Sequence, residues 1–159
     1  MKRLLASIFL LTSVCGALHA KPQATPTPTP APAAPAIPEG AEAQARSEAL
    51  ELAGAFSNDG YKIRDGFYFG ELAPGKSVVI EVNLFAGDEY WFCAAANSPG
   101  RKIAVKVYNE HGAAVEQQAY ENGASAAAGV VAGESGKYLV KVTLAEGETA
   151  PICFLYCYK

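Results

Sequence analysis

The segment SVVIEVNL, residues 77–84, alternates between two kinds of side chain along its whole length. The first set comprises Val78, Ile80, Val82 and Leu84, and the second Ser77, Val79, Glu81 and Asn83. A repeat of two residues is the period of a β-strand with one buried face and one wet face. The segments 102–109 and 137–144 show the same period. The sequence therefore predicts an extended, layered structure for this part of the chain.

Turn-forming residues separate eight runs of this kind between residues 59 and 159. Gly, Pro, Asn, Asp and Ser occupy the breaks, as they do in tight turns. The candidate strands cover 66–72, 76–84, 89–96, 102–109, 113–121, 125–132, 137–146 and 150–159. Regular short strands with turn signals between them are typical of an all-β sandwich. We therefore expect residues 59–159 to form an all-β, jelly-roll-like antiparallel sandwich of about eight strands.

The first twenty residues have the pattern of a secretory signal peptide. Lys2 and Arg3 precede an apolar run, Leu4 to Val14, which is followed by small residues. Such a run is too short to cross a bilayer. Cys15 raises the alternative of a lipid anchor, but Val14 before it fits a lipoprotein signal poorly. We expect an exported protein, periplasmic or secreted, with no transmembrane span in its mature chain.

Two further segments precede the predicted sandwich. Residues 21–38 are rich in Pro, Thr and Ala, and proline excludes both helix and sheet there, which predicts an extended linker. Residues 39–58 are rich in good helix formers. A narrow stripe of Leu50, Ala53 and Phe56 predicts a short helix that docks on the sandwich or frays.

Three runs resemble the bacterial pre-peptidase C-terminal (PPC) domain family. They are GFYFGELAPGKSVVIEVNLFAGDEYWF at 66–92, VKVYNEHGAAV at 105–115 and GESGKYLVKVTL at 133–144. The resemblance extends over 66–159 and implies a small jelly-roll-like domain with an accessory role, without implying an activity. Some members of the family bind calcium. Here the available carboxylates, Asp59, Asp65, Asp88 and Glu89, have no spacing that singles them out, so we predict no metal site.

The cysteines constrain one another. Cys153 and Cys157 would lie about 13 Å apart along one strand, whereas a disulfide needs Cα atoms within about 7 Å. The partner is then Cys93, because the third and eighth strands of a jelly roll are antiparallel neighbours. Periodicity leaves both pairings open, with Cys153 slightly favoured because it lies deeper in its strand. The alternative is three reduced, buried cysteines, although an oxidising compartment favours pairing.

The sequence contains few motifs that indicate catalysis or the binding of a known ligand. The net charge is -3, and basic residues do not cluster after the N-terminus, which argues against binding of nucleic acid. His111 lies in the predicted turn NEHGAA, and a solvated histidine is the expected state there. The chain has no nucleophile elbow and no phosphate-binding loop. We predict no enzyme, no catalytic residue and no cofactor.

Aromatic side chains are the remaining lead to a function. If Phe92 and Phe154 face the core, Trp91 and Leu155 lie on the opposite face with the cysteines. Tyr68 and Trp91 are then candidate ligand contacts, although a core position for Trp91 is favoured. We predict an exported, non-enzymatic binding or accessory module of the bacterial envelope or extracellular space, whose ligand, a protein partner or a polysaccharide, the sequence does not identify. The alternative is a carbohydrate-binding module that recognises a polysaccharide through surface Tyr and Trp.

Overall fold

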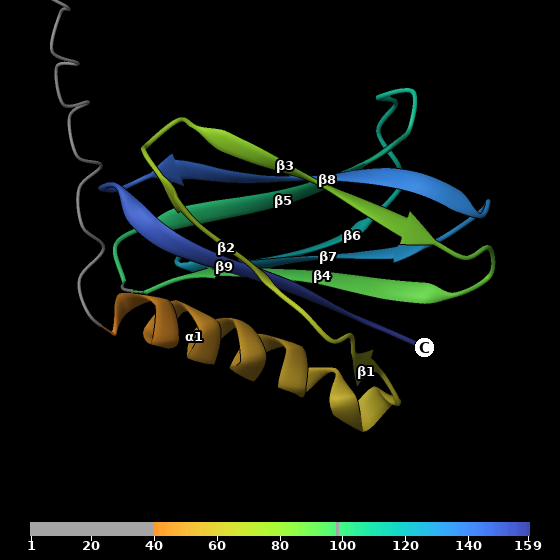
Figure 1. Cartoon of the computed structure of the whole chain (residues 1–159), viewed down its shortest axis with the longest axis horizontal. Coiled ribbons are helices and arrows are strands. Elements are labelled where there is room, and N and C mark those ends of the chain that lie inside the picture. The colour runs from red at the N-terminus through yellow and green to blue at the C-terminus, as the bar shows by residue number, and fades with distance from the viewer. Residues whose placement is uncertain (1–39, 98) are drawn as a thin grey trace, which may run out of the picture. The chain divides into compact units, whose positions relative to one another are not determined.

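The computed structural model describes residues 40–97 and 99–159, and the predicted signal peptide and linker lie outside this part of the chain. The predicted all-β sandwich is confirmed: two antiparallel sheets pack face to face, and one helix lies against the outer side of the larger sheet (Figure 1). The helix is α1, Ala41–Ala55, followed by a short 3₁₀ turn at Ser57–Asp59.

The larger sheet has the order β1-β9-β4-β7-β6, and β2 also pairs with β9. Its strands are β1 (Lys62–Ile63), β2 (Tyr68–Leu72), β4 (Glu89–Ala96), β6 (Gln118–Asn122), β7 (Ser125–Val131) and β9 (Ala150–Tyr158). The smaller sheet has the order β3-β8-β5. Its strands are β3 (Ser77–Leu84), β5 (Lys102–Asn109) and β8 (Gly136–Glu146). All eight predicted strands are present, and β4 and β9 are antiparallel neighbours as expected.

The main core lies between the two sheets. It is built from the inward halves of the alternating strands, including Phe92, Ile103, Val140, Val142 and Ile152. The predicted inward positions of Phe92 and Phe154 are confirmed, since both are buried in this cluster. Their rings lie parallel, with centroids 6.2 Å apart. Burial of this apolar surface is the main force that holds the sheets together.

A second core lies between α1 and the outer face of the larger sheet. The buried stripe of the helix is made of four alanines spaced four residues apart, Ala41, Ala45, Ala49 and Ala53. Their small side chains meet Cys93, Ala95, Ala127 and Cys153 of the sheet. Small residues on both sides let the helix approach closely. The predicted stripe is corrected at Leu50, which is 38% exposed.

Two strand boundaries differ from the sequence prediction. The run predicted at 113–121 pairs as β6 only from Gln118, because the preceding residues lie along the edge of β5. There the Val115 N–H donates to the Val107 carbonyl at 3.0 Å. The Gln117 side chain accepts from the Val107 N–H at 2.8 Å and donates to the Val105 carbonyl at 3.1 Å. The strand β1 was not predicted, since two residues are too short to show alternation.

In the described part of the chain, no helix has the length and apolar character that crossing a membrane would need.

Candidate functional site

A hollow of about 330 Å³ opens at the edge of the sandwich, between β9 and β2 on one side and β3 on the other. We call it the mouth hollow. Its walls carry Arg64, Phe67, Tyr68, Glu81, Phe154 and Tyr156, among others. The volume falls at the small end of the range for ligand pockets, about 300–1,000 Å³.

The mouth hollow exists because two short strands share one edge of β9. Strand β1 pairs near Cys157 and strand β2 starts opposite Phe154. Between them the chain leaves β9 and turns at Gly66, whose φ of 98° favours glycine. One backbone bond spans this gap, from the Arg64 N–H to the Tyr156 carbonyl at 3.0 Å. The interrupted pairing leaves the side of Tyr156 open to solvent.

Two tyrosines in the mouth hollow carry hydroxyl groups that the protein does not use. Within residues 40–97 and 99–159, neither the Tyr68 nor the Tyr156 hydroxyl has a hydrogen-bond partner, and neither oxygen is sealed from solvent. The Tyr68 hydroxyl lies over Gly70, in space that a Cβ atom would fill. Burial raises the pKa of Tyr156, and the nearby Arg64 partly opposes the shift. A phenol hydroxyl can both donate and accept a hydrogen bond, so each of the two is available to a ligand.

Charged groups surround these rings. The Arg64 guanidinium lies over the Tyr156 ring, 5.9 Å from its centroid, and Arg46 of α1 lies over Phe67 at 4.4 Å. Phe67 itself is 41% exposed. On the β3 side, Glu81 forms an ion pair with Lys137 at 2.9 Å. The mouth hollow therefore combines aromatic rings with positively and negatively charged side chains.

A second hollow, of about 300 Å³, lies on the outer face of the larger sheet beyond the end of α1. We call it the outer hollow. Its lining includes Tyr61, Glu89, Trp91, Glu116, Gln118 and Val131. The register places Trp91, Gly129 and Gln118 in one row across β4, β7 and β6.

Both faces of the Trp91 indole are covered by the protein. On one side the Phe56 ring stacks on it, with centroids 4.3 Å apart and planes 12° from parallel. On the other side the indole lies over Gly129, so closely that a Cβ atom there would be 2.7 Å from its Cζ2. The ring therefore cannot stack on a ligand. This argues against Trp91 as an exposed ligand contact and fits the favoured core position, here in the second core.

The polar groups of the outer hollow also bind one another. The Tyr61 hydroxyl donates to Glu89 Oε2 at 2.6 Å. Lys159 Nζ lies 3.2 Å from the same oxygen and 4.6 Å from the centroid of the Tyr61 ring. These bonds lower the pKa of Glu89, the Tyr61 hydrogen bond being the larger cause. The chain of contacts ties the segment after α1 to the sheet.

The two predicted ligand contacts are therefore not brought together. Tyr68 lies in the mouth hollow and Trp91 lines the outer hollow, and the two rings pack against different cores. The sequence prediction missed Arg64, Phe67 and Tyr156 as neighbours of Tyr68. With a period of two, Tyr156 shares the face of Phe154, but the gap that exposes its ring depends on how β1 and β2 divide the edge of β9.

The structure holds Cys93, Cys153 and Cys157 as free, buried thiols, so the predicted disulfide is not formed in it. The register gives the reason: Leu155 lies opposite Cys93, and both other cysteines are diagonal to it. Diagonal Cα atoms are about 7–8 Å apart, beyond the reach of a relaxed disulfide. Burial raises the pKa of Cys153 to about 11.

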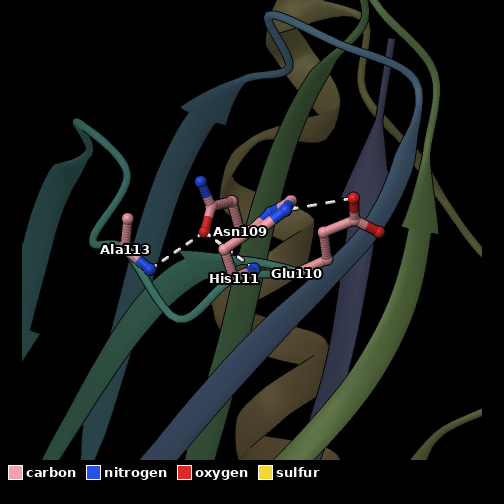
Figure 2. Close-up of polar contacts among 4 residues, drawn as sticks. All are labelled: Asn109, Glu110, His111 and Ala113. Carbon is pink, nitrogen blue, oxygen red and sulfur yellow. Dashed lines mark hydrogen bonds and ion pairs between the residues drawn. The ribbon is translucent and has the colours of Figure 1, made fainter.

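His111 lies in the turn after β5, as predicted. Its backbone N–H donates to Asn109 Oδ1 at 3.1 Å, and the Ala113 N–H donates to the same oxygen at 2.9 Å (Figure 2). The imidazole Nδ1 is 3.7 Å from Glu110 Oε1, and the His111 side chain is 79% exposed. In the described residues, no group of three or more His, Cys, Asp or Glu side chains is placed to hold a metal ion.

No protein-family model matches the chain, and no curated protein matches it. Two solved structures align with it at low similarity. One is a periplasmic inhibitor of g-type lysozyme from Aeromonas hydrophila, with 14% identity, 59% of this chain and 85% of that chain covered, and a TM-score of 0.42. The other is described as a CBM4, with 20% identity, coverage of 64% and 78%, and a TM-score of 0.38. Likenesses this remote carry no argument about function, and the resemblance to the pre-peptidase C-terminal family stays a prediction.

Proposed function

We propose that this chain is an exported, non-enzymatic binding module and that the mouth hollow binds a segment of a carbohydrate chain. The observation that carries the proposal is the pair of unpartnered hydroxyls of Tyr68 and Tyr156 beside the exposed ring of Phe67. A sugar ring has apolar C–H faces and a rim of hydroxyls. Such a ligand needs flat aromatic surface together with donors and acceptors that the protein has left free.

The outer hollow is the weaker candidate, although its size is similar. Its Trp91 ring is stacked between Phe56 and Gly129, and its Tyr61 and Glu89 are bound to each other. A ligand there would have to break contacts before it gained any. In the mouth hollow, a ligand would displace water from the Tyr68 and Tyr156 hydroxyls without breaking a hydrogen bond within the protein.

A protein partner remains the rival class of ligand. Its support would be exposed apolar surface, and the exposed large apolar side chains come from seven separate segments of the chain. They are Leu50, Ile63, Phe67, Val79, Phe85, Tyr120 and Val131. Isolated residues of this kind are normal on a protein surface. Because no helix or strand of residues 40–97 and 99–159 carries more than one of them, the carbohydrate ligand is favoured.

The proposal is tested by glycan-array binding, followed by calorimetry with the best soluble oligosaccharide. We expect Tyr68→Phe and Tyr156→Phe each to weaken binding about fivefold, because each removes a hydrogen bond worth ~1 kcal/mol. Stability should stay unchanged, since neither hydroxyl bonds to the protein. The matched control is Tyr120→Phe, which removes the hydroxyl of an exposed tyrosine on β6, outside the mouth hollow.

Three outcomes decide the proposal. Weakening by both mouth variants with an unaffected control supports it. Binding that is insensitive to Tyr68 and Tyr156 contradicts the assignment of the hollow. If the array shows no glycan at all while a crosslinker captures a defined protein partner from the native compartment, the carbohydrate function is wrong and the rival class replaces it.

A further inference from the structure

Three buried thiols lie on the outer face of the larger sheet, and their surroundings differ. Cys93 Sγ and Cys157 Sγ both contact the Trp91 carbonyl oxygen, at 3.9 and 3.8 Å. Each thiol also shifts the pKa of the other, as expected for neighbouring side chains. Cys153 lies under α1, where the charged groups nearest to it are Arg46 and Glu42. Cys153 and Cys157 are both diagonal to Cys93 in the strand register, but their surroundings differ.

We propose that Cys93 and Cys157 form a reversible dithiol–disulfide pair and that Cys153 remains a thiol. Both sulfurs lie against the same carbonyl oxygen, so they can approach each other to bonding distance with a limited movement of the two strands. The diagonal register strains the resulting bond, because it places the two Cα atoms slightly too far apart. Strained disulfides are the ones that reductants open most readily. The structure thus describes the reduced state of a pair that an oxidant can close.

The exchange can begin at either sulfur. With the Cys157 thiolate as the first nucleophile, Cys93 is the thiol that resolves the mixed disulfide. The oxidant required is a low-molecular-weight disulfide. Because both thiols are buried, the attack occurs when the layer that covers them opens or before it has formed.

The chemistry balances as two exchange steps. The Cys157 thiolate attacks one sulfur of the oxidant, which forms a mixed disulfide and releases one thiol. Cys93 then loses its proton and attacks Cys157 Sγ, which releases the second thiol. The protein gives up two electrons and two protons, and both end on the two released thiols.

The test is a peptide map of the chain after incubation with oxidised glutathione, acid quenching, denaturation and alkylation. We expect a linked peptide that joins Cys93 to Cys157, and one alkylated thiol per chain, at Cys153. A small dithiol should restore three thiols without denaturant. A linkage between Cys93 and Cys153, three thiols after oxidation, or a bond that resists the dithiol would each overturn the proposal.

Matched variants sharpen this result. Cys153→Ser should keep the bond and leave no thiol, whereas Cys157→Ser should lose the bond and leave two. Two thiols in Cys157→Ser support the pairing, whereas a Cys93–Cys153 bond in that variant contradicts the assignment of Cys153 as the thiol that does not pair. If a serine variant does not fold, the map of the unmodified chain decides the pairing. Carbohydrate binding is not read out at any step, so the outcome is independent of the proposed ligand.

Discussion

The outer hollow and the mouth hollow have similar volumes but opposite states of their aromatic and polar groups. In the outer hollow, Trp91 and Tyr61 are fully engaged by Phe56, Gly129 and Glu89. In the mouth hollow, Tyr68 and Tyr156 keep hydroxyls that bind nothing in the described part of the chain. A tryptophan beside a hollow thus holds the fold together here, while less conspicuous tyrosines are free for a ligand. Predictions that separate stability from binding test this contrast.

The largest expected effect is on stability, from Trp91→Ala. Removing a ring stacked between Phe56 and Gly129 leaves a cavity, and we expect a loss of about 3 kcal/mol of unfolding free energy. Glycan binding by the folded fraction should be unchanged. Urea denaturation and calorimetry measure the two quantities. A variant that lost binding but kept its stability would reverse the roles assigned to the two hollows.

A smaller loss of stability is expected from Gly129→Ala. The new Cβ would lie 2.7 Å from the Trp91 ring, which must shift, at a cost of about 2 kcal/mol. The matched control is Gly133→Ala, because a Cβ atom at Gly133 meets nothing within 4 Å. Thermal unfolding of both variants gives the comparison. Equal stability of the two would show that the indole is not held against β7.

Gly70→Ala performs the equivalent experiment on the mouth hollow. The added methyl group takes the space of the Tyr68 hydroxyl and pushes that ring from its position. We expect glycan affinity to fall about tenfold, with a smaller loss of stability than in Gly129→Ala. Calorimetry gives the affinity. Full affinity in this variant would mean that the position of Tyr68 is irrelevant to the ligand.

The smallest effect concerns pH and the contact of Glu89 with Tyr61 and Lys159. Since the folded protein lowers the pKa of Glu89, this contact stabilises the fold above the ordinary glutamate pKa. Its contribution is lost as the pH falls through the lowered value. Tyr61→Phe should flatten that part of the stability profile between neutral and acidic pH, measured by urea denaturation. Mouth variants such as Tyr156→Phe should leave it unchanged.

The strands of both sheets could be predicted from the sequence, but the two hollows could not. Alternation in 77–84, 102–109 and 137–144 predicted β3, β5 and most of β8, because one wet and one dry face impose the period of two. The same alternation placed Trp91 on the face away from Phe92. It could not show that α1 covers that face, since the buried stripe of the helix is alanine, which looks unremarkable in a sequence.

The mouth hollow depends on a break in pairing, which no period reveals. It arises because β1 and β2 share the edge of β9 and leave a gap beside Tyr156. Tyr68 was identified as a candidate from its aromatic character alone, and its neighbour Tyr156 comes from a segment distant in the chain. The choice between Cys153 and Cys157 as the partner of Cys93 was likewise undecided. A period of two places both on the same face of the strand, whereas their surroundings differ in the twisted sheet.

The most direct test is a ¹H–¹⁵N correlation spectrum of the chain, titrated with the oligosaccharide that binds best on the array. Resonance shifts should concentrate at residues 64–70, 80–83 and 154–156, around the mouth hollow. The amides of Trp91, Gln118 and Gly129 should stay in place. Shifts concentrated at those three residues, with the mouth hollow unaffected, would contradict the account.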